Sequence, residues 1–162
     1  GFHEAQIVAD TDAFGALIPR NEGIRTLGAI FSSGTFTGRA PEGKVLLTCM
    51  IGGRHDEAAN DLTDQELRDQ VLADIRPLLG ITGEPSFERV FRWARGIPQY
   101  ELGHLERVAT ARAAADAAGG IFLGGNSVAG VSFNQCIAHA EELGASVIDH
   151  LLALDESLAQ GV

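Results

Sequence analysis

The chain has 162 residues, a formal net charge of -10, 45% hydrophobic residues and 21% charged residues. This composition indicates a globular protein with a hydrophobic core, in one domain or one and a half. The acidic balance argues against nucleic acid as a partner, because phosphate binding is driven by lysine and arginine. No apolar run approaches the roughly 18 residues that a membrane-spanning helix needs.

The two cysteines, Cys49 and Cys136, both lie in apolar runs. We interpret them as free buried thiols of a reducing compartment. No signal peptide is recognisable, so the sequence favours a cytoplasmic location and leaves peripheral membrane association open. The first residue is Gly1 rather than methionine, which favours a chain cut from a longer protein.

Three apolar runs in the first third of the chain predict strands, at residues 13–19, 26–32 and 45–51. The loops between them are rich in glycine, proline and asparagine. Their lengths favour an antiparallel meander. Because the run 45–51 is apolar on both faces, it is expected to be the central strand.

The first predicted helix starts at Thr63. Thr63 and Glu66 fit a capping box, and Leu62 and Leu67 occupy the two positions of a hydrophobic staple. Gly80 is expected to end the helix. An apolar stripe predicts that the helix covers one face of the sheet. The stripe consists of Leu67, Val71, Ile75, Leu78 and Leu79.

The remaining elements follow in order. Residues 85–95 are aromatic and β-branched, which predicts a fourth strand. Residues 104–118 are alanine-rich and predict a helix that ends at Gly119. A short buried strand is expected at 121–123, then a glycine turn at 124–130, then a helix. The apolar face of that last helix contains Phe133, Cys136, Ile137, Ala140, Gly144, Val147, Ile148 and Leu151.

The strand, turn and helix start at 121–137 form the pattern with most chemical content. The first turn of a helix has unpaired N–H groups and a partial positive charge, which suit an anionic or electron-rich ligand. Glycine lets the backbone approach such a ligand closely. The turn is neither G-x-G-x-x-G nor a P-loop. From the local pattern alone, a turn without any ligand is equally compatible.

The residues give little support for a metal site, a catalytic nucleophile or a pair of catalytic carboxylates. The five histidines show no metal-ligand spacing, and neither cysteine lies in C-x-x-C. There is no G-x-S-x-G nucleophile elbow and no paired-carboxylate pattern. Trp93 is interpreted as a core or rim aromatic, and Phe36 either as a loop anchor or as an aromatic that grips a flat apolar ligand.

Taken together, several segments resemble the C-terminal part of the protoporphyrinogen oxidases, a family within the flavin amine oxidases. They follow the family's order and spacing over nearly the whole chain. The segments are 14–19 (FGALIP), 27–33 (LGAIFSS), 36–41 (FTGRAP), 45–48 (VLLT), 51–53 (IGG), Trp93, 97–100 (IPQY), 102–107 (LGHLER), 121–126 (IFLGGN), 130–131 (GV) and 134–137 (NQCI).

The resemblance implies an α+β fold in two parts. Residues 1–102 would belong to a substrate domain, with an antiparallel or mixed sheet and covering helices. Residues 103–162 would be the C-terminal helix–strand–helix segment of a Rossmann-like FAD-binding domain. The implied activity is FAD-dependent oxidation of protoporphyrinogen IX to protoporphyrin IX in haem biosynthesis, with the hydride chemistry supplied by the flavin.

By position, the resemblance also assigns site residues. The expected cofactor-binding residues are Trp93, Asn126, Val131, Ser132 and Phe133. Leu17 and Phe36 are expected to form walls of the tetrapyrrole pocket. No catalytic acid, base or metal ligand is assigned. The chain departs from the family at 124–129 (GGNSVA), where Ala-Gly-Asn is usual, and at Ala138 or His139, where a glycine is usual.

The family's N-terminal dinucleotide fingerprint does not occur in this sequence. We therefore expect this chain alone to retain FAD poorly and to require an N-terminal FAD-binding segment as partner. Self-association through exposed apolar surface is also expected. Two alternatives stay open. One is a non-catalytic remnant that binds a tetrapyrrole or a protein, and the other is a flavin amine oxidase relative with a different substrate.

Overall fold

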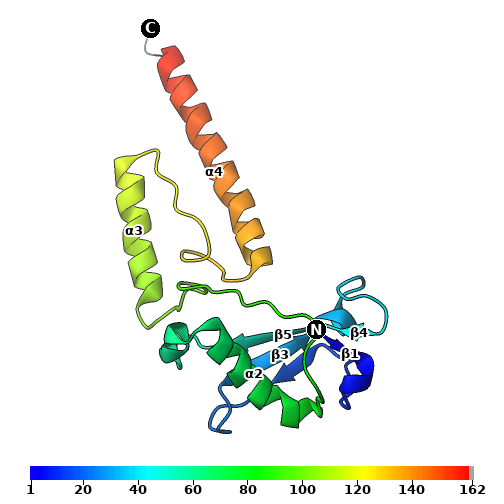
Figure 1. The fold of residues 1–162 in the computed structure, drawn as a ribbon. Coiled ribbons are helices and arrows are strands. Elements are labelled where there is room, and N and C mark those ends of the chain that lie inside the picture. The colour runs from blue at the N-terminus through cyan, green and yellow to red at the C-terminus, as the bar shows by residue number, and fades with distance from the viewer. Residues whose placement is uncertain (161–162) are drawn as a thin grey trace. The chain divides into compact units, whose positions relative to one another are not determined.

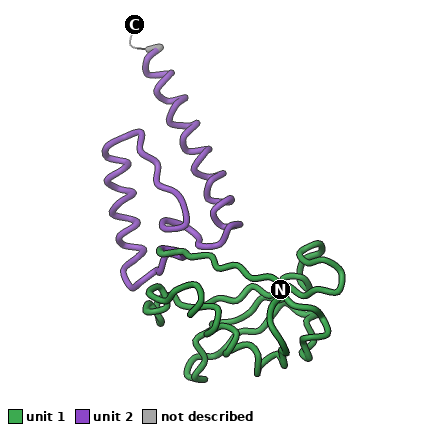
Figure 2. Tube along the Cα trace, in the orientation of Figure 1, with its two compact units in different colours: residues 1–94 green, residues 95–162 purple. Residues whose placement is uncertain are grey.

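The structure is a computed structural model that describes residues 1–160. The chain forms two compact units, Gly1–Ala94 and Arg95–Val162 (Figure 2). The first unit combines short strands with one long helix, and the second contains two long helices. This mixture of helix and antiparallel sheet agrees with the expected α+β class.

The first unit contains five short strands, two 3₁₀ turns and two helices. In chain order these are β1 (Phe2–His3), η1 (Glu4–Gln6), β2 (Gly15–Leu17), β3 (Thr26–Phe31), α1 (Ser32–Thr35), β4 (Lys44–Val45), β5 (Leu47–Ile51), η2 (Glu57–Asp61) and α2 (Asp64–Leu79). Figure 1 shows α2 lying against the strands.

The main sheet has the strand order β2-β3-β5, and both pairs are antiparallel. The predicted meander is therefore confirmed, but the prediction that residues 45–51 form its central strand is wrong. The run divides after Val45, which pairs with Phe2 in a separate two-stranded sheet. In the described chain, residues 47–51 then pair only with β3 and lie at the sheet edge, and β3 is central. The side chain of Met50 is exposed at this edge.

Helix α2 supplies one side of the core. Leu72, Ile75 and Leu79 are buried with Phe2 and Phe31 in a single cluster. Leu78 was expected in the apolar stripe, but it is 49% exposed and Leu72 is buried instead. Burial of the apolar cluster is the main force that holds the helix on the sheet.

Both ends of α2 are as predicted. The Thr63 hydroxyl accepts a hydrogen bond from the Glu66 N–H, and the Glu66 carboxylate accepts one from the Thr63 N–H. Gly80 ends the helix with a φ of 61°, in the left-handed region that favours glycine.

The predicted strand at 85–95 is wrong. No β-ladder forms there in the described residues, although Ser86 and Phe87 donate hydrogen bonds to the Gly1 carbonyl. The segment is attached mainly by side chains. Arg92 of the segment donates to Asp64 at the start of α2, and Arg68 of α2 donates to Glu88 of the segment. The aromatic residues predicted the strand, but a strand also needs a partner for its backbone.

The second unit contains α3 (His104–Ala118) and α4 (Phe133–Gln160). The predicted helix at 104–118 is confirmed, and the Gly119 N–H bonds to carbonyls in its last turn. The connection at 119–132 runs between the two helices (Figure 1). The strand predicted at 121–123 is wrong, because the backbone of these residues has no ladder partner in the described chain.

The helix predicted after the glycine turn is confirmed as α4, but its apolar face is only partly covered within this unit. The side chain of Phe133 is 79% exposed, and Ile148 and Leu151 are more than half exposed. None of the helices in residues 1–160 combines the length and the apolar character that crossing a membrane requires.

Candidate functional site

The glycine turn that joins the connection to α4 is a compact structure. The N–H groups of Val128 and Ala129 both donate to the Gly125 carbonyl, with N···O distances of 3.0 and 3.1 Å. Gly125 has a φ of 94°, which a residue with a side chain rarely adopts. The backbone therefore reverses direction between Gly125 and Ala129 before it enters the helix.

The start of α4 is held by a reciprocal cap. The Gln135 N–H donates to the Ser132 hydroxyl at 3.2 Å, and the Ser132 N–H donates to the Gln135 Oε1 at the same distance. The Ser132 carbonyl accepts the Cys136 N–H. Ser132 is thus the N-cap of the helix, with Gln135 completing a capping box.

Two glycines let the turn lie directly against α4. A Cβ at Gly130 would lie 2.3 Å from the Gln135 Cβ, and one at Gly124 would lie 2.7 Å from the Leu143 Cδ2. The first contact involves an atom that cannot rotate away, and Gly130 also has a φ of 68°. The position of Gly130 therefore requires glycine both for space and for backbone conformation.

Side chains hold two further carbonyls of the turn. The Tyr100 hydroxyl donates to the Asn126 carbonyl at 2.5 Å, and the Cys136 thiol donates to the Gly130 carbonyl at 3.3 Å. By contrast, the N–H groups of Val131, Phe133 and Asn134 have no acceptor among residues 1–160. The turn therefore presents open donors at the positive end of a long helix.

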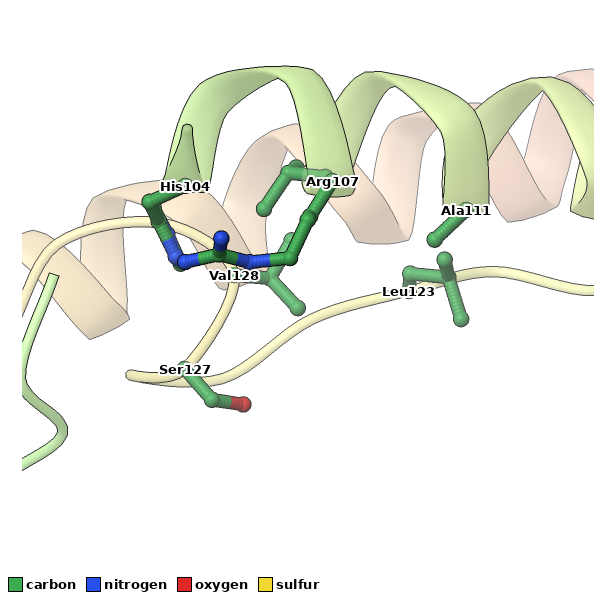
Figure 3. Close-up of a pocket in the computed structure, with 7 residues that line it drawn as sticks. His104, Arg107, Ala111, Leu123, Ser127 and Val128 are labelled. Atoms are coloured by element: carbon green, nitrogen blue, oxygen red, sulfur yellow. The ribbon is translucent and has the colours of Figure 1, made fainter. Parts of the chain in front are cut away.

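A shallow hollow lies between α3 and the turn. It has a volume of about 280 Å³ and is lined by His104, Arg107, Val108, Ala111, Leu123, Ser127 and Val128. Figure 3 shows the residues of α3 on one side and Leu123 and Ser127 of the connection on the other. The His104 Nε2 is buried here with no hydrogen-bond partner in the described chain. Pockets that enclose a drug-sized ligand are usually larger than this.

The site residues predicted from the sequence are divided between the two units. Asn126, Val131, Ser132 and Phe133 all lie in the turn and the helix start of the second unit. This unit brings them together around the open N–H groups.

The other three lie in the first unit, on three separate segments. Leu17 ends β2 and is 86% exposed, Phe36 follows α1 and is 49% exposed, and Trp93 lies in the extended segment and is 77% exposed. The Arg39 guanidinium lies 5.5 Å from the centre of the Phe36 ring. Their assignment to a cofactor or substrate site stays a prediction.

Sequence reasoning missed two residues that shape the turn. Gln135 could have been found, because Ser132 and Gln135 have the S-x-x-Q spacing of a capping box ahead of an apolar run. Tyr100 gave no local signal, because its hydrogen-bond partner lies 26 residues further along the chain. Cys136 was interpreted as core filling only, whereas its thiol also contacts the turn.

Comparison with known proteins identifies the family to which this sequence belongs. The model of the family described as flavin-containing amine oxidoreductase matches residues 3–143. The chain belongs to this family. Because the match covers both units, it includes the predicted substrate-site segments and the glycine turn.

Named relatives of this family member come from plants and bacteria. Protoporphyrinogen oxidase of Oryza sativa subsp. japonica, named as chloroplastic, is 39% identical over 152 residues, which are 91% of this chain and 28% of the relative. Protoporphyrinogen oxidase 1 of Spinacia oleracea, also named as chloroplastic, is 40% identical over 91% of the chain and 27% of the relative. Coproporphyrinogen III oxidase of Bacillus subtilis (strain 168) is 31% identical over 94% and 33%. The chain thus spans about a third or less of these relatives.

Membership in a flavin-containing family implies a flavin cofactor. The turn offers what the electron-rich edge of a flat heterocycle would require, namely open N–H groups at a helix start and glycines that allow close approach. The residues present are therefore compatible with contact to part of a flavin. Within the described chain, the hollow beside α3 is too small and open to enclose the whole cofactor.

Proposed function

We propose that the protein carrying this chain is an FAD-dependent porphyrinogen oxidase that converts protoporphyrinogen IX to protoporphyrin IX. One observation carries the proposal. Relatives named for porphyrinogen oxidation match about nine-tenths of the chain. The bacterial relatives named coproporphyrinogen III oxidase support coproporphyrinogen III as a second candidate substrate.

In this proposal, residues 103–162 form part of a Rossmann-like FAD-binding domain, and residues 1–102 form part of the substrate domain. The unpaired backbone at 121–123 supports this division, because an extended segment without a ladder can complete a sheet with further strands. The adenosine half of FAD would be held by an N-terminal segment that carries the dinucleotide fingerprint. The 162 residues alone are expected to retain little FAD.

The turn residues would hold the flavin mainly through backbone atoms. The N–H groups of Val131 and Phe133 are open and would donate to the electron-rich edge of the ring. Ser132 would act differently. Its hydroxyl and its N–H are both engaged with Gln135, so its role would be to hold the helix start in place. Asn126 would contribute through the turn that its carbonyl anchors.

The first unit would supply apolar contacts to the tetrapyrrole. Leu17 and Phe36 are exposed on segments that lie before and after the central strand, as expected of pocket walls. Trp93 would lie near the flavin. When bound, FAD would supply the two-electron acceptor for each of the three hydride removals that turn a porphyrinogen into a porphyrin, and dioxygen or another acceptor would reoxidise it each time. The residues of this chain would orient both groups and exclude water, and we assign none of them as acid or base.

The test uses the protein expressed from its complete reading frame. We expect a flavin absorption spectrum near one flavin per chain, and oxidation of protoporphyrinogen IX or coproporphyrinogen III with much higher kcat/KM than of amines or carotenoid precursors. The ratio of the two porphyrinogen values identifies the substrate. A flavin-free protein that binds a porphyrin would favour the non-catalytic remnant. A flavin-containing protein that oxidises only amines or carotenoid precursors would favour a flavin amine oxidase relative with a different substrate.

A further inference from the structure

We propose that Tyr100 is a positioning residue that sets the location of the glycine turn and thereby the affinity for flavin. The inference rests on the proposed function, because it assumes that the turn contacts a flavin. Its physical basis lies entirely within the second unit. It concerns a tether between the loop ahead of α3 and the turn ahead of α4.

The tether has two well-defined contacts. The Tyr100 ring stacks on the His104 imidazole, with 3.9 Å between ring centres and an angle of 11° between planes. The Tyr100 hydroxyl donates to the Asn126 carbonyl at 2.5 Å. Since His104 is the first residue of α3, this pair of contacts connects the start of α3 to the middle of the turn.

Three further contacts of the turn lead to α4. Gly124 packs against Leu143, Gly130 packs against Gln135, and the Cys136 thiol bonds to the Gly130 carbonyl. On the α3 side the turn faces the open hollow rather than a packed surface. In the described chain, the Tyr100 hydroxyl therefore makes the hydrogen bond that spans the incompletely filled side of the turn.

A substitution can separate the two contacts of Tyr100, the stacking of its ring and the hydrogen bond of its hydroxyl. Phenylalanine at this position would keep the ring stacked on His104 but would leave the Asn126 carbonyl without its donor. Because Tyr100 is 42% exposed, water can replace part of the lost bond, and the unit should still fold. The turn, however, would gain freedom to move away from the geometry that presents its N–H groups. Flavin binding would then have to order the turn again, and this cost would raise the flavin dissociation constant.

The experiment compares Tyr100→Phe with wild type in the protein expressed from its complete reading frame. The control is Ser146→Ala, which also removes one side-chain hydrogen bond to a backbone carbonyl in this unit, within α4 itself. We expect the flavin dissociation constant to rise about fivefold in Tyr100→Phe, the effect of one net hydrogen bond, and to be unchanged in Ser146→Ala. Both variants should unfold in one cooperative thermal transition, which shows that each is folded.

A second measurement needs no flavin. Amide hydrogen exchange at Val128 and Ala129, whose N–H groups close the turn, should be faster in flavin-free Tyr100→Phe than in Ser146→Ala. Should Tyr100→Phe not fold, His104→Ala takes its place. It removes the stacking partner, keeps the hydroxyl, and is expected to raise exchange at the same two amides.

The outcomes distinguish a failure of the proposed role of Tyr100 from a failure of the proposed function. Equal flavin affinity and equal exchange in Tyr100→Phe and Ser146→Ala would overturn the role of Tyr100 while the proposed function stands. A wild-type protein without any flavin affinity would overturn the proposed function. The exchange comparison would then still decide whether Tyr100 holds the turn.

Discussion

A single carboxylate connects α2 to the central strand of the first unit. The Asp74 Oδ2 accepts hydrogen bonds from both the N–H and the hydroxyl of Thr26, at 2.8 and 2.7 Å. The Oδ1 accepts one from Gln70, one helical turn away. Thr26 is 1% exposed and Asp74 is 7% exposed. Removing one partner from such a buried group lowers the stability by more than one hydrogen bond contributes, because the remaining partner is left buried without a hydrogen bond.

Replacing Asp74 therefore tests this connection. Asp74→Ala should lower the free energy of unfolding by about 3 kcal/mol, because the N–H and hydroxyl of Thr26 are then buried without an acceptor. Urea unfolding followed by circular dichroism measures the loss. Asp69→Ala, on the exposed side of the same helix, is the matched control and should cost much less, because water replaces the lost contacts of an exposed carboxylate. Equal losses in the two variants would show that Asp74 does not have this role.

At the scale of elements, arginine side chains attach the extended segment at 82–94. Arg76 and Arg68 of α2 both reach Glu84, at 2.6 and 2.7 Å. These two guanidinium groups lower the pKa of Glu84 below its ordinary value. The contribution of these ion pairs to the attachment is therefore complete above the ordinary value and is lost as the pH falls through the lowered pKa. Further along, Arg92 donates to Asp64 and to the Leu62 carbonyl.

The only tryptophan of the chain follows Arg92 and reports on this attachment. Arg92→Ala should free the end of the segment and lower the fluorescence anisotropy of Trp93. Arg89→Ala is the control, because Arg89 lies in the same segment and contacts the Phe91 ring. It should leave the anisotropy near the wild-type value. If both variants lower the anisotropy equally, the Arg92 contacts do not hold the segment.

The elements also show which features the sequence alone could predict. The ends of α2 and α3 were predicted correctly, because Thr63, Glu66, Gly80 and Gly119 act on backbone groups within a few residues. The strands predicted at 85–95 and 121–123 were wrong, because a strand depends on a partner that its own residues do not specify. The central position of β3 was missed for the same reason.

In the candidate site, too, features set by neighbouring residues could be predicted, and features that depend on distant residues could not. The glycine turn and the helix that follows it were predicted from local residues, and both are present. The bond from Tyr100 to Asn126 depends on how a loop folds back across 26 residues. No local pattern encodes that distance. The roles of Leu17, Phe36 and Trp93 were inferred from a family resemblance, and they await a measurement.

For the whole molecule, the main feature is the large apolar side chains exposed in both units. Leu17, Phe91 and Trp93 in the first unit and Phe133 and Leu158 in the second are each more than half exposed. Apolar surface that is exposed in a soluble protein often marks a site of interaction with another chain or segment. We propose that further parts of an FAD-binding domain cover the face of α4. We also propose that the 162 residues alone self-associate.

The most direct test of the central claim is amide hydrogen exchange on the protein expressed from its complete reading frame, with and without bound flavin. We expect the amides of Val131, Phe133 and Asn134 to exchange at least tenfold more slowly when flavin is bound, because flavin would supply the acceptors that they lack. Protection confined to other segments, with unchanged exchange at these three amides, would contradict the assignment of the turn to the flavin.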